Sequence, residues 1–342
     1  MSIRVLIVDD SPTMRAILMS RLGEQDDIEV VGTASDAAEG RALIKRLDPD
    51  VVTLDIEMPG MNGLDFLEKI MTLRPTPVII VSGATHEGND VTARALGLGA
   101  VNCYSKYDLS GRLALQDGGE LAEMIRDAAQ VKFRAPAKTA PVMAEESRRS
   151  IRRDTRLIAI GASTGGVEAL QVLLREFPAD CPPTLIVQHV NPRFAPAIAR
   201  TLDQAGPARV QVAAHDMPLQ PGNVYLAATA DHHLMVRGGG NALMARLRRG
   251  QAVSGHVPSV DALFASVAEQ VGPGAVGILL TGMGQDGARG LLAMSEAGAH
   301  TIAQDEQTCI VFGMPRAAIS LGAARVVAPI GRIARHAFNK AA

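Results

Sequence analysis

The chain has 342 residues, of which 47% are hydrophobic, 20% charged and 3% aromatic, with a net charge of −2 and no Trp. This length suits two domains, while the near-neutral charge and the scarcity of aromatic side chains argue against nucleic acid or an anionic membrane surface as a partner. The three cysteines, an odd number without metal-ligand spacing, indicate a reducing compartment rather than a disulfide framework.

The first apolar run, residues 4–8, is short and ends at Asp9 and Asp10, which is unlike a signal peptide or a membrane anchor. No later stretch approaches the roughly eighteen apolar residues that a spanning helix needs. We therefore expect a soluble, cytoplasmic protein that does not insert into a membrane.

Short β-branched runs alternate with helical patterns in the first 125 residues. The runs at 4–8, 50–54 and 77–81 are continuous and apolar, as in parallel strands that are buried on both faces. Ser11 and Pro12 together form a helix start signal after the first run. This alternation predicts an α/β domain with a doubly wound, mostly parallel sheet.

Polar side chains follow these predicted strands, at the sheet edge where chemistry gathers in such folds. They are Asp9, Asp10, Asp55, Ser82 and Lys106. Clustered carboxylates repel one another, a repulsion that Mg²⁺ with oxygen ligands relieves, and a carboxylate there can attack a phosphoryl group. Any single Asp could instead be a helix cap or turn residue, but five polar residues at strand ends favour a site.

The segments VLIVDDS, TLDIEMPGMNG and VSG, together with Lys106, resemble the receiver domain of two-component response regulators over residues 1–125. The resemblance implies a flavodoxin-like fold in which Asp55 accepts a phosphoryl group from a chemotaxis histidine kinase. It also implies that Ser82 and Lys106 contact the phosphoryl oxygens. The implied Mg²⁺ ligands are Asp9, Asp10, Asp55 and the backbone carbonyl of Glu57.

Two positions depart from the receiver pattern. Tyr107 follows the lysine where proline is usual, and Cys103 occupies the aromatic switch position. Tyr104 is adjacent, but the alternation of a strand points it to the other face.

Charge separates this region from the rest of the chain. Residues 1–131 carry 21 acidic and 12 basic side chains, whereas residues 132–156 carry 3 acidic and 8 basic ones. The basic stretch is rich in Pro, Ala and Ser, as linkers are. We expect a linker over 126–154; the alternative is a surface helix with a solvated basic face around 148–156.

A second strand–turn–helix pattern begins at residue 157, where an apolar run leads into Gly-Ala-Ser-Thr-Gly at 161–165. This pattern matches the G-x-S-x-G elbow that projects a nucleophilic serine, here Ser163. A phosphate-binding glycine-rich turn has the same features, although no Walker lysine is present.

A serine nucleophile needs a base and an acid that orients the base. His189 ends another apolar run, and Asp286 lies in a glycine-rich turn whose N–H groups could face a reacting oxygen. A structural histidine and a cap of the next helix are the alternatives for these two residues. Among the other histidines, His232 and His233 are expected in a hairpin within 225–236, and His256 in a loop.

Five segments of the second region carry a further resemblance: GASTGG, VQHV, PSVDALF, TGMGQDGA and QDEQTCIVFGMPRAA. They resemble the catalytic domain of chemotaxis protein-glutamate methylesterases, across residues 155–342. The resemblance implies a doubly wound, three-layer domain with a β-hairpin that acts as a hydrolase and needs no cofactor at its esterase site. The family joins it by a linker to a receiver domain. The order Ser163, His189, Asp286 differs from the Ser, Asp, His order of the α/β-hydrolase family, so the shared elbow does not place the chain in that family.

The resemblance implies an enzyme, a protein-glutamate methylesterase and protein-glutamine glutaminase that is regulated by phosphorylation. Ser163 would attack glutamate methyl esters or glutamines on methyl-accepting chemoreceptors, His189 would move the proton, and Asp286 would orient His189. The N–H of Met283 would stabilise the oxyanion, with support from Thr164. The resemblance also implies that the outcome would be receptor adaptation in chemotaxis.

Departures from the methylesterase pattern at 228–229 and at Val257 bear on substrate preference. Two other classes stay open: a signalling module without hydrolysis, and a DNA-binding response regulator. The second would need a basic helix-turn-helix, which the near-neutral region 157–342 does not offer.

Overall fold

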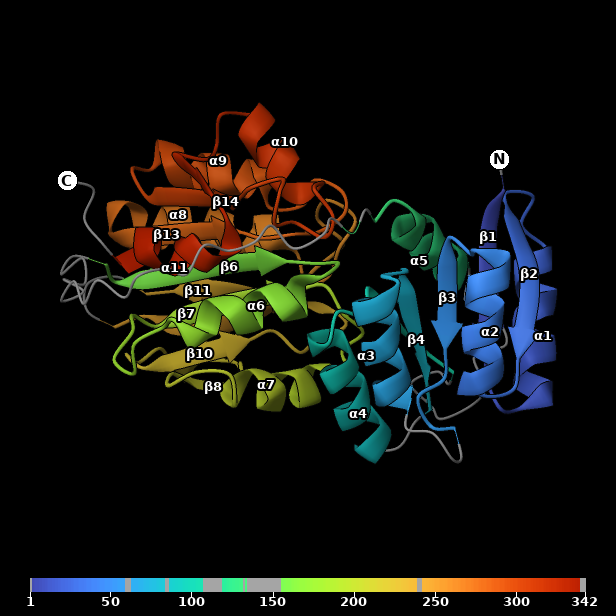
Figure 1. The fold of residues 1–342 in the computed structure, drawn as a ribbon. Helices are drawn as coiled ribbons and strands as arrows, with labels where there is room; N and C mark the ends of the chain where they lie inside the picture. The colour runs from blue at the N-terminus through green and yellow to red at the C-terminus, as the bar shows by residue number, and fades with distance from the viewer. Residues whose placement is uncertain are drawn as a thin grey trace, which may run out of the picture. The chain divides into compact units, whose positions relative to one another are not determined.

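The computed structural model divides into two compact units, Met1–Phe133 and Arg134–Ala342. Figure 1 shows their elements in chain order. The structure describes residues 2–58, 63–83, 86–106, 119–131, 133, 155–238 and 242–338. Most of the expected linker and Tyr107 lie outside these ranges. In the described part of the chain, no helix is both long and apolar enough to cross a membrane.

The first unit is built on a five-stranded sheet in the order β2-β1-β3-β4-β5, and every neighbouring pair is parallel. This order is that of flavodoxin-like folds, as expected, and its switch point lies between β1 and β3. The strands are β1 Ile3–Val8, β2 Ile28–Ala34, β3 Val51–Leu54, β4 Val78–Ser82 and β5 Asn102–Ser105. The helices are α1 Pro12–Gly23, α2 Ala37–Leu47, α3 Gly63–Leu73, α4 His86–Gly97 and α5 Glu120–Ala129.

Local signals in the first unit act as the sequence predicts. The Ser11 side chain accepts a hydrogen bond from the N–H of Met14 and caps α1, with Pro12 as the first helical residue. The central strands are almost wholly inaccessible because helices cover both faces of the sheet. Helix α5 spans the residues on both sides of the boundary expected at 125.

The second unit contains a seven-stranded parallel sheet in the order β15-β14-β13-β6-β7-β10-β8. Helices α8, α9 and α10 pack with one face of the sheet, and α6, α7 and α11 form another packed group. The strands are β6 Leu157–Ala162, β7 Thr184–Gln188, β8 Arg209–Val212, β10 Asn223–Leu226, β13 Ala275–Leu279, β14 His300–Gln304 and β15 Val326–Ala328. The helices are α6 Gly166–Arg175, α7 Ala195–Asp203, α8 Val260–Gln270, η1 Gly272–Gly274, α9 Ala288–Glu296, α10 Met314–Ser320 and α11 Ile330–Phe338.

A small antiparallel sheet accompanies the large one, and it contains the expected hairpin in a different pairing. Strands β11 His232–Arg237 and β12 Met244–Arg249 form the hairpin, with β9 Met217–Pro218 on the far side of β12. The sequence analysis placed the hairpin within 225–236, but Tyr225 belongs to β10 of the parallel sheet. Tyr225 is almost fully buried. Burial of its ring in the core favours the parallel sheet over the hairpin for this residue. The α/β class with two doubly wound sheets is confirmed.

Candidate active site

The first unit brings its predicted strand-end residues together. Lys106 follows β5, and its Nζ lies 2.6 Å from Asp55 Oδ2 and 2.9 Å from Asp9 Oδ2. Carboxylate oxygens of Asp9, Asp10 and Asp55 all lie within 4.8 Å of one another. Ser82 is buried at the end of β4. These groups come from four different strands that end at one edge of the sheet.

Opposing charges compete in this cluster. Burial raises the pKa of Asp9, and Lys106 offsets only part of that effect. Burial works to lower the pKa of Lys106, but the ion pairs with Asp55 and Asp9 together outweigh it and raise that pKa. The cluster therefore concentrates two buried carboxylates around one ammonium, which leaves negative charge in excess.

The donor set fits a hard divalent cation. Carboxylate oxygens are the ligands that Mg²⁺ prefers. Asp9, Asp10 and Asp55 each offer a carboxylate oxygen within 4.8 Å of the others, and Lys106 is the one ammonium that contacts this group among the described residues, at Asp9 Oδ2 and Asp55 Oδ2. The N–H of Glu57 donates to Asp55 Oδ1 at 3.0 Å, which fixes the backbone that follows β3.

In the second unit, Ser163 lies in a tight turn between β6 and α6. The N–H of Gly166 donates to the carbonyl of Ser163 at 2.7 Å, which closes the turn. Gly165 has φ of +74°, and a Cβ on it would lie 2.6 Å from Ile310, so both its conformation and its space require glycine. The expected strand–turn–helix elbow is present, with Ser163 only partly buried.

The glycine-rich turn after β13 runs directly against this serine. A Cβ on Gly282 would lie 2.6 Å from the Cβ of Ser163, so the backbone at 282 passes next to the nucleophile position. The N–H of Ser163 donates to the carbonyl of Thr281 at 3.0 Å. The N–H groups of Met283 and Thr164 donate to no described residue.

His189 follows β7 and is hydrogen-bonded to Asp286. Its Nε2 lies 2.9 Å from Asp286 Oδ2, and the two side chains are 10% and 0% exposed. The N–H of His189 donates to the carbonyl of Ala162, which sets His189 beside the serine turn. His189 Nδ1 is buried without a hydrogen-bond partner among the described residues, so no bond joins it to Ser163 in this structure. Nδ1 is thus the ring nitrogen left for a second partner.

Asp286 owes its orientation to the N-terminus of α8. Its carboxylate accepts hydrogen bonds from Ser259 Oγ at 2.8 Å, Val260 N–H at 2.7 Å and Asp261 N–H at 2.9 Å. It does not cap the next helix in the chain, because α9 begins after Gly287 without a side-chain cap. The alternative role as a cap of that helix is therefore wrong.

These bonds also set the charge of Asp286. Burial works to raise its pKa, but the hydrogen bond with His189 and those from the start of α8 outweigh burial and hold the pKa below its ordinary value. The partial positive charge at a helix N-terminus acts in the same direction. Asp286 is therefore ionised at neutral pH.

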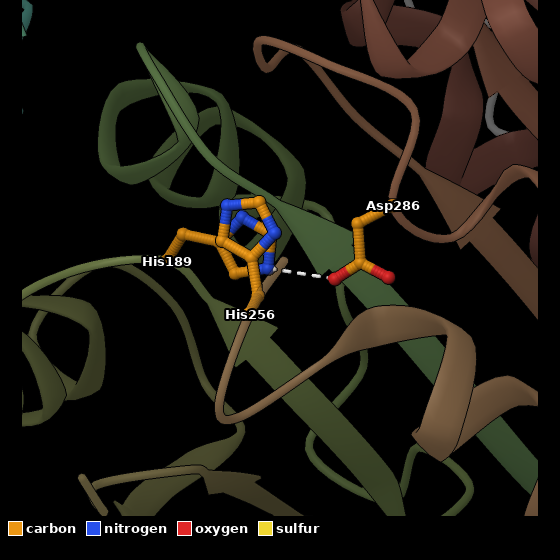
Figure 2. Close-up of side chains that lie close together, drawn as sticks. All are labelled: His189, His256 and Asp286. Atoms are coloured by element: carbon orange, nitrogen blue, oxygen red, sulfur yellow. Dashed lines mark hydrogen bonds and ion pairs between the residues drawn. The ribbon is translucent and has the colours of Figure 1, made fainter. Parts of the chain in front are cut away.

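Sequence reasoning missed three residues of this site. Gln188 is buried, and its Nε2 donates to the carbonyl oxygens of Ser163 at 2.8 Å and His189 at 3.0 Å. Ser259 both caps α8 and binds Asp286. His256 stacks on His189, as Figure 2 shows. Ser259 was detectable as a serine before a helical pattern, whereas nothing in the spacing pointed to the other two contacts.

Comparison with known families agrees with this geometry. Residues 158–337 match the family model described as CheB methylesterase, which covers more than half of the chain. The chain belongs to the CheB methylesterase family. Residues 5–114 match the response regulator receiver domain. Both resemblances found in the sequence are thus confirmed, and with them the expectation of an enzyme.

Relatives match the chain over almost its full length. It is 51% identical to protein-glutamate methylesterase/protein-glutamine glutaminase 1 of Caulobacter vibrioides, over 94% of this chain and 93% of the relative. It is 50% identical to the protein-glutamate methylesterase/protein-glutamine glutaminase of Rhizobium etli, over 96% of this chain and 94% of the relative. The crystal structure of the Thermotoga maritima CheB methylesterase catalytic domain is 32% identical, with a TM-score of 0.51 over 53% of this chain and 96% of that one.

Proposed function

We propose that this enzyme hydrolyses glutamate methyl esters and deamidates glutamines on methyl-accepting chemoreceptors, with Ser163, His189 and Asp286 as its catalytic residues. The observation that carries the proposal is the 2.9 Å bond between His189 and Asp286 beside the Ser163 turn. That bond holds one ring nitrogen and leaves the other, Nδ1, as the base for the serine.

The ester reaction then follows in two halves. Ser163 Oγ attacks the ester carbonyl carbon while its proton passes to His189 Nδ1. The resulting imidazolium returns that proton to the methoxy oxygen, so methanol leaves and an acyl-enzyme forms. Water attacks the acyl carbon in the same way, and the glutamate carboxylate and free serine are released. A glutamine follows the same path with ammonia as the leaving group.

Charge that develops on the carbonyl oxygen needs hydrogen-bond donors. The backbone N–H of Met283 and that of Thr164, the residue after the nucleophile, have no partner among the described residues. Both flank the contact between Ser163 and residue 282. We assign the oxyanion site to Met283, supported by Thr164, and the esterase chemistry needs no cofactor.

For the first unit, we propose that Asp55 accepts a phosphoryl group from a chemotaxis histidine kinase and that this modification regulates the esterase. Ser82 and Lys106 would bind the phosphoryl oxygens. The Mg²⁺ ligands would be Asp9, Asp10, Asp55 and the backbone carbonyl of Glu57. When bound, Mg²⁺ offsets the negative charge of the transferring oxygens.

The biological role proposed is receptor adaptation in the cytoplasm. The domain organisation proposed is a receiver over 1–125, a linker over 126–154 and a methylesterase domain over 155–342. The family match and the paired strand-end sites support this assignment. It also implies no role for nucleic acid.

Methanol release from methylated receptor membranes tests the proposal. Wild-type protein should release methanol and Ser163→Ala should not, while the control Ser320→Ala, an exposed serine at the end of α10, should match wild type. If Ser163→Ala kept most of the activity, the serine-hydrolase assignment would be wrong. For regulation, phosphorylated wild type should differ in kcat/KM from the unphosphorylated protein, and Asp55→Asn should abolish the difference.

A further inference from the structure

Outside the three proposed catalytic residues, one side chain lies flat against the base. The His256 and His189 rings are parallel within 2°, and their centroids are 3.8 Å apart (Figure 2). Aromatic pairs more often have centroids about 4.5 to 7 Å apart. At the shorter distance no water fits between the rings, so His256 covers one face of His189.

The base needs such a contact because its hydrogen bond fixes only one edge of the ring. Asp286 holds Nε2 at 2.9 Å, but the ring plane can still rotate about that bond. The torsion between a histidine ring and its Cβ has broad minima and does not prevent the rotation. A flat group against the ring face does prevent it, and the two restraints together define where Nδ1 points.

His256 is itself held in a tight turn. Val253 and His256 exchange backbone hydrogen bonds of 3.1 and 3.0 Å. The central residues Ser254 and Gly255 have φ of +51° and +84°, the conformation of a two-residue type I′ turn. His256 Nδ1 lies 3.0 Å from the carbonyl oxygen of Ser254, and because that oxygen can only accept, Nδ1 carries the proton.

The same helix end supports both restraints on the base. Ser254 Oγ donates to Asp261 Oδ2 at 2.6 Å, which ties the turn to the start of α8. The N–H of Asp261 in turn donates to Asp286 Oδ1 at 2.9 Å. Asp286, which binds the edge of the His189 ring, and the turn that carries His256, which covers its face, are therefore both held by Asp261 at the start of α8.

The charge state of His256 suits this contact. Burial, together with the neighbouring His189, holds the pKa of His256 below its ordinary value, against smaller effects of Ser254 and Asp286. His256 is thus neutral at neutral pH. A neutral ring does not oppose the positive charge that His189 gains when it takes the serine proton.

We infer that His256 is a positioning residue whose ring face holds His189 in the orientation that aims Nδ1 at Ser163. This inference rests on the proposed function and adds a positioning residue to the three proposed catalytic residues. Ligand atoms of His189, His256 and Asp286 also lie within 4.8 Å of one another, as in a metal site. Parallel rings, however, send their lone pairs side by side rather than toward one point, and Asp286 already accepts bonds from α8, so the geometry favours positioning.

The test compares His256→Ala, which removes the ring, with His256→Phe, which keeps a flat face without nitrogens. On methylated receptor membranes, His256→Ala should lower kcat about 10- to 100-fold with KM nearly unchanged. A misoriented His189 ring slows the chemical step but does not weaken binding of the substrate. His256→Phe should stay near wild type. Val253→Ala, which trims the 40% exposed side chain of the same turn, is the matched control and should also stay near wild type.

Thermal unfolding checks that each variant folds, and His256→Leu replaces His256→Ala if the latter does not. The inference is overturned if His256→Ala keeps full kcat, if KM changes instead of kcat, or if His256→Phe loses as much as His256→Ala. A fluorophosphonate probe that labels Ser163 gives a readout without receptor: labelling should slow in His256→Ala and not in His256→Phe. If wild type neither releases methanol nor reacts with the probe, the proposed function fails rather than the role of His256.

Discussion

The two units place their reactive groups at the same kind of location and hold them in different ways. In the first, charge assembles the cluster, because Lys106 pairs with Asp55 and Asp9 at 2.6 and 2.9 Å. In the second, hydrogen bonds from α8 fix Asp286, which then fixes His189. An ion-paired cluster can exchange partners when a phosphoryl group or metal arrives, whereas the hydrogen-bonded site is ordered before its substrate binds. The first site suits a switch and the second suits repeated catalysis.

The largest expected effect tests whether the second site acts as one unit. Ser163→Ala and His189→Ala should each lower kcat for methanol release by roughly 10⁴- to 10⁶-fold, and the double variant should be little worse, because residues that act together are not additive. Phosphorylation of Asp55 from a small phosphodonor should be unchanged in all three variants. Additive losses in the double variant would show that the two side chains act separately.

Asp286→Asn should have the next largest effect, a loss of about 10⁴-fold in kcat, because an amide offers one accepting oxygen where the carboxylate offers two. The backbone donors Val260 and Asp261 would then compete with His189 for that oxygen. Single-turnover kinetics on methylated receptor measure this loss. A variant with near wild-type kcat would show that α8 does not orient the base.

The same variant gives a pH signature. The folded-state pKa of Asp286 is lowered from 3.8, so its contribution to stability is present above 3.8 and is lost as the pH falls through the lower folded value. The difference in free energy of unfolding between wild type and Asp286→Asn should be constant near neutral pH and shrink in strong acid. Urea unfolding at several pH values measures it, and a difference that grew in acid would contradict the ionised assignment.

A smaller effect is expected when one carboxylate of the first cluster is neutralised. Asp10→Asn should weaken Mg²⁺ binding by at least about tenfold, since it removes a charged oxygen ligand from the group with Asp9 and Asp55. Titration of phosphorylation against Mg²⁺ concentration measures this change. The esterase activity of the unphosphorylated protein should not change, and phosphorylation in excess chelator would rule out the metal site.

The smallest effect is expected at Ser259, whose hydroxyl both caps α8 and binds Asp286. Ser259→Ala should lower the free energy of unfolding by about 1 to 2 kcal/mol. It should lower kcat less than Asp286→Asn does, because two backbone donors remain. Thermal unfolding and methanol release together check this, and a loss of kcat as large as that of Asp286→Asn would give Ser259 a larger role than the geometry supports.

The sequence predicted the first cluster because its members lie at or just after the ends of strands. Asp9, Asp55 and Lys106 follow β1, β3 and β5, so an apolar run and its next residue were enough to find them. His189 was found in the same way after β7, and Ser163 was found from the G-x-S-x-G elbow that follows β6. Parallel strands end at one edge, and that rule converts sequence positions into spatial proximity.

The remaining parts of the second site depend on packing that no local pattern encodes. His256 meets His189 through a turn anchored on α8, and that anchor depends on the bond from Ser254 to Asp261. The sequence analysis paired the strand at 232–236 with the wrong partner. The local sequence around Tyr225 is equally compatible with a hairpin strand and with a buried strand of the parallel sheet, where Tyr225 in fact lies. Such choices are made by tertiary contacts, which override local strand propensity.

The hydrogen bonds from the start of α8 to Asp286 also determine which substitutions this part of the sequence tolerates. Two of its three protein donors besides His189 are the backbone N–H groups of Val260 and Asp261, which every residue except proline supplies. The orientation of the acid is therefore inherited with the position of the helix start rather than with particular side chains. Homologues can replace neighbouring residues on this helix and keep the same carboxylate geometry, so this part of the site has a mutational robustness that the salt-bridged cluster of the first unit lacks.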